Sequence, residues 1–337
     1  MPDTDTADPA RHVLVTGAAG FIGMHACIAL LERGWRVHGV DNLNAYYPVR
    51  LKEDRLAWLR RHPAAGRFEF TRLDIADTGA VAAVCGQAAF THILHLAAQA
   101  GVRHSIDHPL DYAHSNLVGT SVILEAARAA RIRHLVYASS SSVYGGNTRL
   151  PFSEEDRVDR PVSFYAATKR ANEAMAYSYA HLYGIPCTGL RFFTVYGPWG
   201  RPDMAAWLFT DAILAGRSIR VFEQGRLRRD FTYIDDIVEG ICRVMERPAP
   251  ADDAGAPHAL FNIGNHSPNT VNELIAIIEA ATGQRARREE LPMQPGDVEA
   301  TFADVARLSA ATGFEPATSL ESGMRRFVDW FRAYHGR

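Results

Sequence analysis

The first half of the chain alternates short apolar runs with longer segments of helical periodicity. Apolar and β-branched runs bounded by turn residues predict strands, which we place at residues 12–15, 35–40, 68–70, 91–96, 134–139 and 187–193. Helical patterns fall at 21–33, 117–130 and 165–183. Strands and helices that alternate in this way build a parallel sheet with helices on both faces. The pattern therefore predicts an α/β fold with a doubly wound parallel sheet.

After Arg191 the strict alternation loosens, and Pro198, Gly200 and Pro202 mark a loop. Further helices are expected at 205–215, 234–247, 271–282 and 322–334, with short strands at 219–222 and 260–263. We predict a disordered leader at 1–10, a first domain at 11–190 and a smaller α/β lobe at 191–337. The chain is expected to cross back to the first domain around 231–262.

Composition narrows the class of protein. The 337 residues are 47% hydrophobic and 22% charged, and the net charge is near −2. This balance gives no electrostatic reason to expect binding to nucleic acid or to a membrane surface. The first ten residues are polar and acidic, unlike a signal peptide, and no apolar run approaches the ~18 residues of a membrane span. The four cysteines form no paired spacing, so we predict reduced thiols and a cytoplasmic protein.

A glycine-spaced loop follows the first strand and opens the first helix. Gly17, Gly20 and Gly23 would let the backbone turn tightly and approach a pyrophosphate at the helix N-terminus. The spacing is GxxGxxG, and alone it would equally fit an ordinary strand–helix turn. Asp41 ends the second strand about twenty residues later, where a carboxylate can accept a hydrogen bond from a ribose 2′-hydroxyl. The same charge would repel a 2′-phosphate, so NAD is favoured over NADP.

Four consecutive serines, 139–142, end the fifth strand, and Tyr165 and Lys169 follow on a predicted helix. Tyr165 and Lys169 are separated by four residues and share one helix face. An ammonium group beside a phenol favours the phenolate, and a serine hydroxyl can share the proton. Such a set is suited to hydride chemistry on an alcohol carbon, although a YxxxK spacing also arises by chance on amphipathic helices.

The chain contains 14 histidines, and two pairs invite a metal interpretation. His92 and His95 alternate with apolar residues in a predicted strand. His104 and His108 run into Pro109. Neither pair belongs to a set with convincing ligand spacing, so we expect structural or surface histidines and no metal.

The motifs together resemble those of the extended short-chain dehydrogenase/reductase family, in its nucleotide-sugar epimerase and dehydratase branch. The resemblance covers residues 11–335. Its motifs are TGAAGFIG, DNLN, LDIAD, HLAAQAGVR, YASSSSVYG, YAATK, RFFTVYGPWGRPDMA, RRDFTYIDD, FNIGN and MQPGD. Within this family the chain is most similar to the UDP-glucuronate 4-epimerases. The resemblance implies a Rossmann-type NAD-binding domain and a C-terminal lobe that binds a UDP-sugar. It also implies a homodimer formed through the helices at 117–130 and 165–183.

The resemblance also assigns roles to residues. Tyr165 would remove the proton of the sugar 4-hydroxyl, Ser140 would share it, and Lys169 would hold the nicotinamide ribose. The cofactor-binding residues implied are Gly17, Gly20, Phe21, Ile22, Gly23, Asp41, Asn42, Asp74, Ile75, Leu96, Ala97, Ala98, Asn116, Tyr165 and Lys169. The substrate-binding residues implied are Arg103, Ser140, Ser141, Ser142, Thr194, Arg201, Phe222, Arg229, Gln294 and Asp297.

Serines 141 and 142 bear on which reaction is catalysed. Related dehydratases carry an Asp-Glu pair immediately after the catalytic hydroxyl residue, and UDP-glucuronate decarboxylases carry a Glu two positions after it. Here Ser141 and Ser142 occupy those positions. With Thr194 and Arg201 they are candidates to hold a uronate carboxylate. The expected reaction is 4-epimerisation of UDP-glucuronate to UDP-galacturonate. A 4-epimerase of another UDP-hexose or UDP-uronate, a UDP-glucuronate decarboxylase and a cofactor-binding sensor without activity are the alternatives.

Overall fold

The computed structural model describes residues 11–293 and 299–336, so the predicted leader at 1–10 lies outside the described residues. The chain divides into two compact units. The first comprises the N-terminal part up to Gly145, Val158–Arg191 and Val238–Phe261. The second comprises Gly146–Arg157, Phe192–Ile237 and Asn262–Arg337. The assignment of NAD binding to one domain and UDP-sugar binding to the other stays a prediction.

The first unit is built on a seven-stranded sheet with strand order β10-β6-β5-β4-β1-β2-β3. The strands are β1 His12–Thr16, β2 Arg36–Asp41, β3 Phe68–Arg72, β4 His92–His95, β5 His134–Ser140, β6 Cys187–Phe192 and β10 His258–Ile263. Neighbouring strands from β3 to β5 pair in parallel. The strand order changes direction between β1 and β4. Ligands of open α/β sheets bind outside the carboxyl ends of the strands at such a point.

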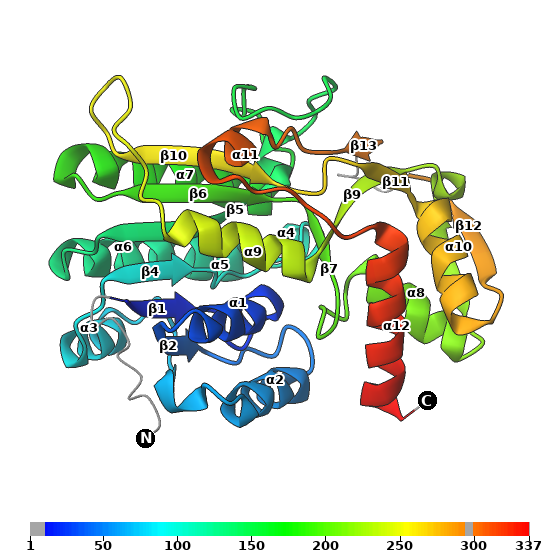
Figure 1. Cartoon of the computed structure of the whole chain (residues 1–337). Helices are drawn as coiled ribbons and strands as arrows, with labels where there is room; N and C mark the ends of the chain where they lie inside the picture. The colour runs from blue at the N-terminus through cyan, green and yellow to red at the C-terminus, as the bar shows by residue number, and fades with distance from the viewer. Residues whose placement is uncertain (1–10, 294–298, 337) are drawn as a thin grey trace. The chain divides into compact units, whose positions relative to one another are not determined.

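Helices cover both faces of this sheet (Figure 1). On one face lie α1 Phe21–Glu32, α2 Val49–Arg61 and most of α9 Ile234–Met245. On the other, α6 packs against both α3 and α7, and their bounds are α3 Thr78–Gln87, α6 Gly119–Ala129 and α7 Phe164–Tyr183. Shorter pieces are α4 His104–Asp107, α5 Pro109–Tyr112, a π-helix Ala113–Val118 and 3-10 turns at Ala65–Arg67 and Ser141–Tyr144.

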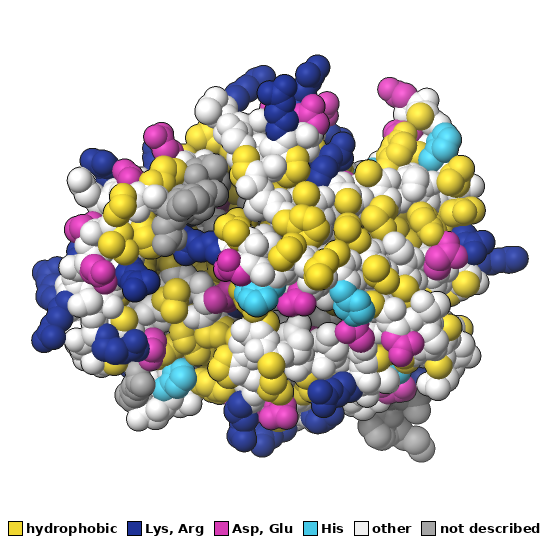
Figure 2. Space-filling model, turned by 180° about the vertical axis from the view of Figure 1, so that it is seen from behind, with side chains coloured by type: hydrophobic (Ala, Val, Ile, Leu, Met, Phe, Trp, Pro, Cys, Tyr) yellow, Lys and Arg dark blue, Asp and Glu magenta, His cyan; other side chains and the backbone are white. Residues whose placement is uncertain are grey.

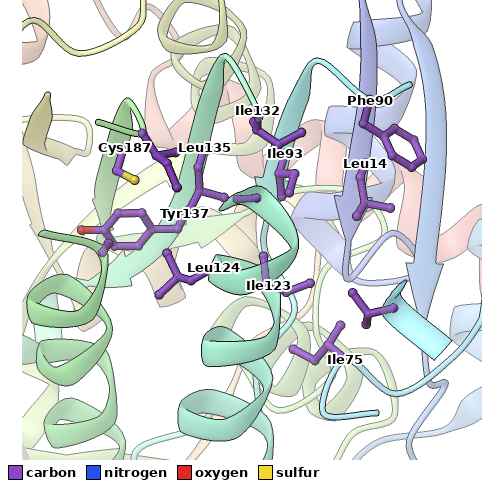
Figure 3. Packing of buried hydrophobic residues seen from close by; sticks show 14 of the residues in the cluster. Leu14, Ile75, Phe90, Ile93, Ile123, Leu124, Ile132, Leu135, Tyr137 and Cys187 are labelled. Atoms are coloured by element: carbon purple, nitrogen blue, oxygen red, sulfur yellow. The ribbon is translucent and has the colours of Figure 1, made fainter. Parts of the chain in front are cut away.

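A core of aliphatic side chains joins the sheet to α6 (Figure 3). Leu14, Ile93 and Leu135 come from three adjacent strands, and Ile123 and Leu124 project toward them from α6. All five are at most 1% exposed. Burying a side chain of this size stabilises a fold by about 1.5–3 kcal/mol. This packing fixes the strands whose carboxyl ends carry the predicted site.

The second unit is organised around strand β9, Arg228–Tyr233. It pairs in parallel with β7 Thr194–Tyr196 and β13 Ala300–Thr301, and antiparallel with β11 Pro268–Thr270. A separate parallel pair joins β8 and β12. The remaining elements are β8 Ser218–Phe222, β12 Arg287–Leu291, a 3-10 turn Glu223–Gly225, α8 Ala205–Leu214, α10 Val271–Thr282, α11 Ala306–Thr312 and α12 Leu320–His335.

The predicted α/β fold with a parallel central sheet is confirmed, but several elements were not predicted, among them α2, α3 and β9. Helix α2 is highly charged, and few of its residues mark a buried face. Helix α3 is rich in Ala and Gly, with no clear apolar stripe. Strand β9 begins with charged residues. The predicted helix at 117–130 also differs, because its α-helical part begins at Gly119 after the π-helix. Among the described residues, no helix is both long and apolar enough to cross a membrane.

Candidate active site

The glycines of the loop after β1 are required by close backbone packing. Gly17 has φ +73°, and its N–H donates to the Val40 carbonyl at 2.8 Å. Gly20 N–H donates to the Gly17 carbonyl at 2.9 Å. A Cβ at Gly23 would lie 2.0 Å from the Gly17 oxygen, and one at Gly17 would lie 2.9 Å from the Ala97 nitrogen. The loop is therefore locked in a tight turn that no larger residue could adopt at Gly17 or Gly23.

The loop delivers the N-terminus of α1 to the switch point of the sheet. Gly20 is the N-cap and offers no side-chain hydrogen bond, and no acidic residue lies in the first turn. The N–H groups of Phe21, Ile22 and Gly23 begin a helix whose dipole favours an anion. These features fit the pyrophosphate of a dinucleotide.

Asp41 lies at the end of β2 beside this loop, as expected for a ribose acceptor. Its side chain is 8% exposed and accepts from Ala19 N–H at 3.2 Å and from Leu43 N–H at 2.8 Å. The neighbouring Asn42 donates to Asp74 at 3.1 Å. Burial alone would raise the pKa of Asp74, but hydrogen bonds from Ala76 N–H and Asn42 lower it. Both carboxylates are therefore held by local donors at the ends of β2 and β3.

Two basic residues of α2 support the cofactor loop and the segment after β2, and neither was predicted from the sequence. The Arg55 side chain is completely buried and donates to the Ala19 carbonyl at 3.1 Å and to Tyr47 Oη at 2.7 Å. Lys52 donates to the Asn44 carbonyl at 2.9 Å. In a helix rich in charge such residues suggest a solvated face, so no sequence signal singled them out.

Asn116 ties the segment after β4 to α7. Its side chain is 1% exposed, accepts from Gln99 N–H at 2.8 Å and donates to the Gln99 carbonyl at 3.1 Å and to Thr168 Oγ1 at 3.0 Å. It lies in the π-helix, a local widening that often occurs at functional sites. Upstream, Ala97 N–H donates to Thr16 Oγ1 at 3.0 Å. Thus β1, the 96–99 segment and α7 are held together by side-chain hydrogen bonds.

Three other predicted cofactor residues, Ile75, Leu96 and Ala98, differ in their burial and contacts. Leu96 N–H donates to the Thr16 carbonyl at 3.2 Å, and Ala98 is partly exposed. Ile75 is 6% exposed and belongs to the hydrophobic core, where its side chain occupies the space in front of Gly119. Contact of these residues with a cofactor stays a prediction.

Lys169 lies against the carboxyl end of β5. Its Nζ donates to the Ala138 carbonyl at 2.9 Å, and the side chain is 4% exposed. Burial lowers the pKa of the ammonium to about 8, and the nearby Glu173 carboxylate opposes this by raising it. Lys169 therefore lies beside the strand that ends in Ser140.

The serines divide into different local roles. Ser139 is buried and donates to Glu173 at 2.6 Å, so it faces the interior. Ser140 is the N-cap of the 3-10 turn, and its Oγ accepts from Ser142 N–H at 3.1 Å and donates to Ser142 Oγ at 3.1 Å. Ser141 and Ser142 are partly exposed. The turn thus begins directly at the predicted catalytic hydroxyl.

Tyr165 lies in the first turn of α7, one turn before Lys169. The helix starts at the N-cap Ser163, whose side chain accepts from Ala166 N–H at 3.1 Å. Tyr165 N–H donates to Ser105 Oγ at 3.2 Å, and its partly buried ring lies 6.1 Å from the Tyr112 ring. The start of α7 is therefore fixed by its own cap and by the 100–112 segment.

A buried ion pair lies behind this site and was also missed from the sequence. Arg191 of β6 donates to the two carboxylate oxygens of Glu173 at 2.8 and 3.0 Å, and both side chains are 1% exposed. Arg191 also donates to Tyr144 Oη at 3.0 Å. Glu173 follows Lys169 by four residues on α7, a spacing that would have placed it on the same helix face.

Six of the predicted substrate residues belong to the second unit. Thr194 begins β7, and Phe222 ends β8. Arg201 pairs with Asp203 through two hydrogen bonds, one of them from Nε at 3.0 Å. Arg229 lies on β9 and donates to the Arg228 carbonyl at 2.9 Å. Gln294 and Asp297 lie outside the described residues. In the first unit, Arg103 is exposed at the start of α4.

The site combines a glycine loop at the switch point of a parallel sheet with Lys169 of α7, which lies against the end of β5 that carries Ser140. This combination is typical of nucleotide-dependent enzymes that act on alcohols. The chain belongs to the NAD dependent epimerase/dehydratase family, whose family model matches residues 13–264.

Along most of its length, the chain is similar to two named relatives and to one solved structure. The chain is 46% identical to Protein CapI of Staphylococcus aureus over 334 residues, which cover 96% of this chain and 99% of that protein. It is 46% identical to UDP-glucuronate 4-epimerase 2 of Arabidopsis thaliana over 334 residues, 96% of this chain and 76% of that protein. The structure is also similar to UDP-glucuronic acid 4-epimerase from Bacillus cereus in complex with UDP-glucuronic acid and NAD. The TM-score is 0.87 at 32% identity, covering 96% of this chain and 99% of that one.

Proposed function

We propose that this protein catalyses the NAD-dependent 4-epimerisation of UDP-glucuronate to UDP-galacturonate. The observation that carries the proposal is the arrangement of residues at the carboxyl end of β5. Ser140 lies there with Lys169 bound to the Ala138 carbonyl, and serines follow at 141 and 142 in place of carboxylates. A carboxylate at either position would repel a uronate.

The chain's own residues have separate tasks in this reaction. NAD held by the glycine loop and Asp41 would supply the acceptor for the C4 hydride and the source of its return. Tyr165 takes the proton of the 4-hydroxyl and later gives it back, and the Lys169 ammonium favours the phenolate. Ser140 shares that proton, and its Oγ already both accepts and donates hydrogen bonds within the 3-10 turn. The Asn116 contact with Thr168 and the Ser163 cap fix the start of α7, which carries Tyr165 and Lys169, and Lys169 joins this helix to the end of β5 through the Ala138 carbonyl.

The proposed substrate carries a particular hazard. Oxidation at C4 creates a ketone β to the C5 carboxylate, and β-keto acids lose CO₂ readily when the breaking bond stands perpendicular to the carbonyl plane. Hydrogen bonds that hold the carboxylate out of that geometry would protect it. We assign this task to Ser141, Ser142, Thr194 and Arg201. Arg201 is paired with Asp203, so a substrate carboxylate would compete with Asp203 for this guanidinium fork.

The nucleotide half of the substrate is assigned to the second unit. Arg229 would contact the diphosphate, and Phe222 would lie against the uracil. Gln294 and Asp297, with Arg103 of the first unit, complete the proposed set. Arg229 is partly buried on β9, the central strand of its sheet, so its backbone position is fixed.

We also propose that the protein forms a homodimer through α6 and α7. The face drawn in Figure 2, which carries these helices, shows many hydrophobic side chains. The exposed apolar residues on or beside α6 and α7 are Val118, Phe164, Tyr177, Leu182 and Tyr183. An exposed apolar surface of this kind marks an association site, and a second copy presents the same surface. Sedimentation that finds only monomer at micromolar concentration would contradict this assignment.

The state of the four cysteines is relevant to the cellular compartment of the protein. All four are free thiols, and Cys27, Cys187 and Cys242 are buried. Burial raises the pKa of the Cys187 and Cys242 thiols to about 12, so they are unreactive. Free thiols without disulfides suit the reducing cytoplasm, which we propose as the location.

The decisive experiment is incubation of the purified protein with UDP-glucuronate without added NAD, followed by NMR of the sugar. Galacturonate signals support the proposal and show that NAD is retained from expression. Pentose signals would assign decarboxylation instead. Conversion of UDP-glucose but not UDP-glucuronate would assign a hexose 4-epimerase, and no conversion of either sugar, with added NAD as well, would overturn the proposal.

A further inference from the structure

The segment between β4 and the π-helix brings three potential metal ligands together. His104, His108 and Asp111 each offer one ligand atom, and these atoms all lie within 4.8 Å of one another. Metal–ligand bonds to imidazole nitrogen or carboxylate oxygen are about 2.0–2.2 Å long. Two ligands of one ion are therefore about 3–4 Å apart, which small side-chain rotations would reach from the observed positions.

The backbone explains why sequence spacing did not reveal this set. His108 N–H donates to the His104 carbonyl at 3.0 Å, so the two histidines are one helical turn apart. Pro109 does not end the helical path, since it occupies the first turn of α5, where its missing N–H costs nothing. The chain turns again, and Asp111 returns to the side of the histidines.

The histidine rings are already packed together. The rings of His104 and His108 are stacked with centroids 4.2 Å apart, and the Tyr46 ring lies 4.8 Å from His104. His104 is partly buried, whereas His108 and Asp111 are exposed. One ligand is thus held by its neighbours, and an ion could enter from solvent on the other side.

The segment that carries the ligands is anchored at both ends. Ser105 is 1% exposed and donates to the Val102 carbonyl at 2.6 Å. Tyr112 is completely buried and donates to the Ala100 and Gly101 carbonyls at 2.9 and 2.5 Å. An anchored backbone means that binding an ion requires little ordering of the chain.

We propose that His104, His108 and Asp111 form a binding site for a divalent transition-metal ion such as Zn²⁺, with water completing its coordination. Two imidazoles and one carboxylate suit zinc, copper or nickel rather than Mg²⁺ or Ca²⁺, which require more oxygen ligands. The ion would fasten α4 to α5. Because Ser105 accepts from Tyr165 N–H and Tyr112 packs against the Tyr165 ring, it would also stiffen the support of Tyr165.

The test uses the full chain without an affinity tag, treated with EDTA and dialysed. Titration calorimetry with ZnCl₂ should find one ion per chain, and MgCl₂ should give no binding. His108→Ala and Asp111→Asn should each weaken zinc binding at least tenfold. The matched control is His181→Ala. It removes an exposed histidine that also stacks on an aromatic ring, Tyr177, and should leave the affinity unchanged.

Cobalt gives an independent readout. Co²⁺ should produce visible d–d bands without a thiolate charge-transfer band, and Cys85→Ser should leave its spectrum unchanged, which separates this site from the partly exposed Cys85 thiol. The ligand variants should melt at the same temperature as the parent without metal, and only the parent should gain stability with zinc. Zinc binding by His108→Ala and Asp111→Asn that is as tight as that of the parent, or no zinc binding by the parent below about 1 mM, would overturn the proposal.

Discussion

Ser140 and Ser142 are joined by a pair of hydrogen bonds at the end of β5. The Ser140 hydroxyl donates to Ser142 Oγ and accepts from Ser142 N–H, each at 3.1 Å. The proposed proton-sharing residue and the proposed carboxylate-binding residue are therefore coupled directly. A change at position 142 is expected to affect both substrate binding and chemistry.

We predict that Ser142→Glu raises the KM for UDP-glucuronate at least tenfold or releases UDP-pentose. The added carboxylate would repel the sugar's own carboxylate and take the hydrogen bond from Ser140. Ser142→Gln is the matched control, since it has the same size without the charge and should be less impaired. Equal kinetics and equal pentose yields for the two variants would remove the electrostatic explanation.

Tyr165→Phe should lower kcat by about 10²–10⁴-fold, the usual contribution of a positioned acid or base. The packing of the ring against Tyr112 should persist, so NAD content after purification should stay near that of the parent. The control is Tyr177→Phe, which changes an exposed tyrosine farther along α7 and should retain activity. Comparable turnover in Tyr165→Phe would show that another group is the base.

Gly23→Ala should abolish NAD retention. Its Cβ would lie 2.0 Å from the Gly17 carbonyl oxygen, so the loop must open and the helix N-terminus must move. Absorbance of nucleotide released from the denatured protein measures the loss. Gly86→Ala on α3 meets no atom within 4 Å and should be neutral or slightly stabilising. Full NAD occupancy in Gly23→Ala would contradict the assigned loop.

Glu173→Gln should move the alkaline limit of activity to lower pH. Burial lowers the pKa of Lys169 to about 8, and the Glu173 carboxylate raises it, so removing that charge lowers the pKa further. The ammonium is present below its pKa and lost above it, and activity should follow. A pH–rate profile checks this shift, and an unchanged alkaline limb would show that Lys169 is not the limiting group.

The same substitution should destabilise the fold by about 3–5 kcal/mol, because it leaves the buried Arg191 without its ionic partner. Thermal unfolding measures this effect. Combining Glu173→Gln with Arg191→Met should restore much of the stability, since the unpaired charge is gone, but should not restore the alkaline limit. That difference separates electrostatic tuning of Lys169 from general damage to the structure.

The sequence predicted those parts of the molecule that follow local rules. The buried strands β1, β4 and β5 are short runs centred on apolar residues. The glycine loop and the four-residue spacing of Tyr165 and Lys169 can be interpreted directly, because each sets a local backbone geometry. Asn116 was predicted among the cofactor-binding residues, but the buried Arg55 and Glu173 were not predicted at all. Each is polar, and its partner is distant in the sequence, as with Glu173 and Arg191. Only the folded backbone shows that these charges are satisfied rather than solvated.

The proposed metal site illustrates the same limit. His104 and His108 were visible as a pair that runs into Pro109, but no set with convincing ligand spacing was recognised. The proline begins α5, and the path returns Asp111 to the pair. A helix start and a helix stop look similar at a proline when the hydrogen-bond pattern is unknown.

Helix α7 carries Tyr165 and Lys169 in its first turns and Glu173 in its interior, where it is bound to the sheet through Arg191. The reactive groups are thus attached to a helix that a buried ion pair ties to the sheet, rather than to a surface loop. Local opening of that helix requires breaking the core, so its free energy approaches that of global unfolding. Heat inactivation should therefore be all-or-none, and the shelf life of the enzyme should be set by its rate of complete unfolding.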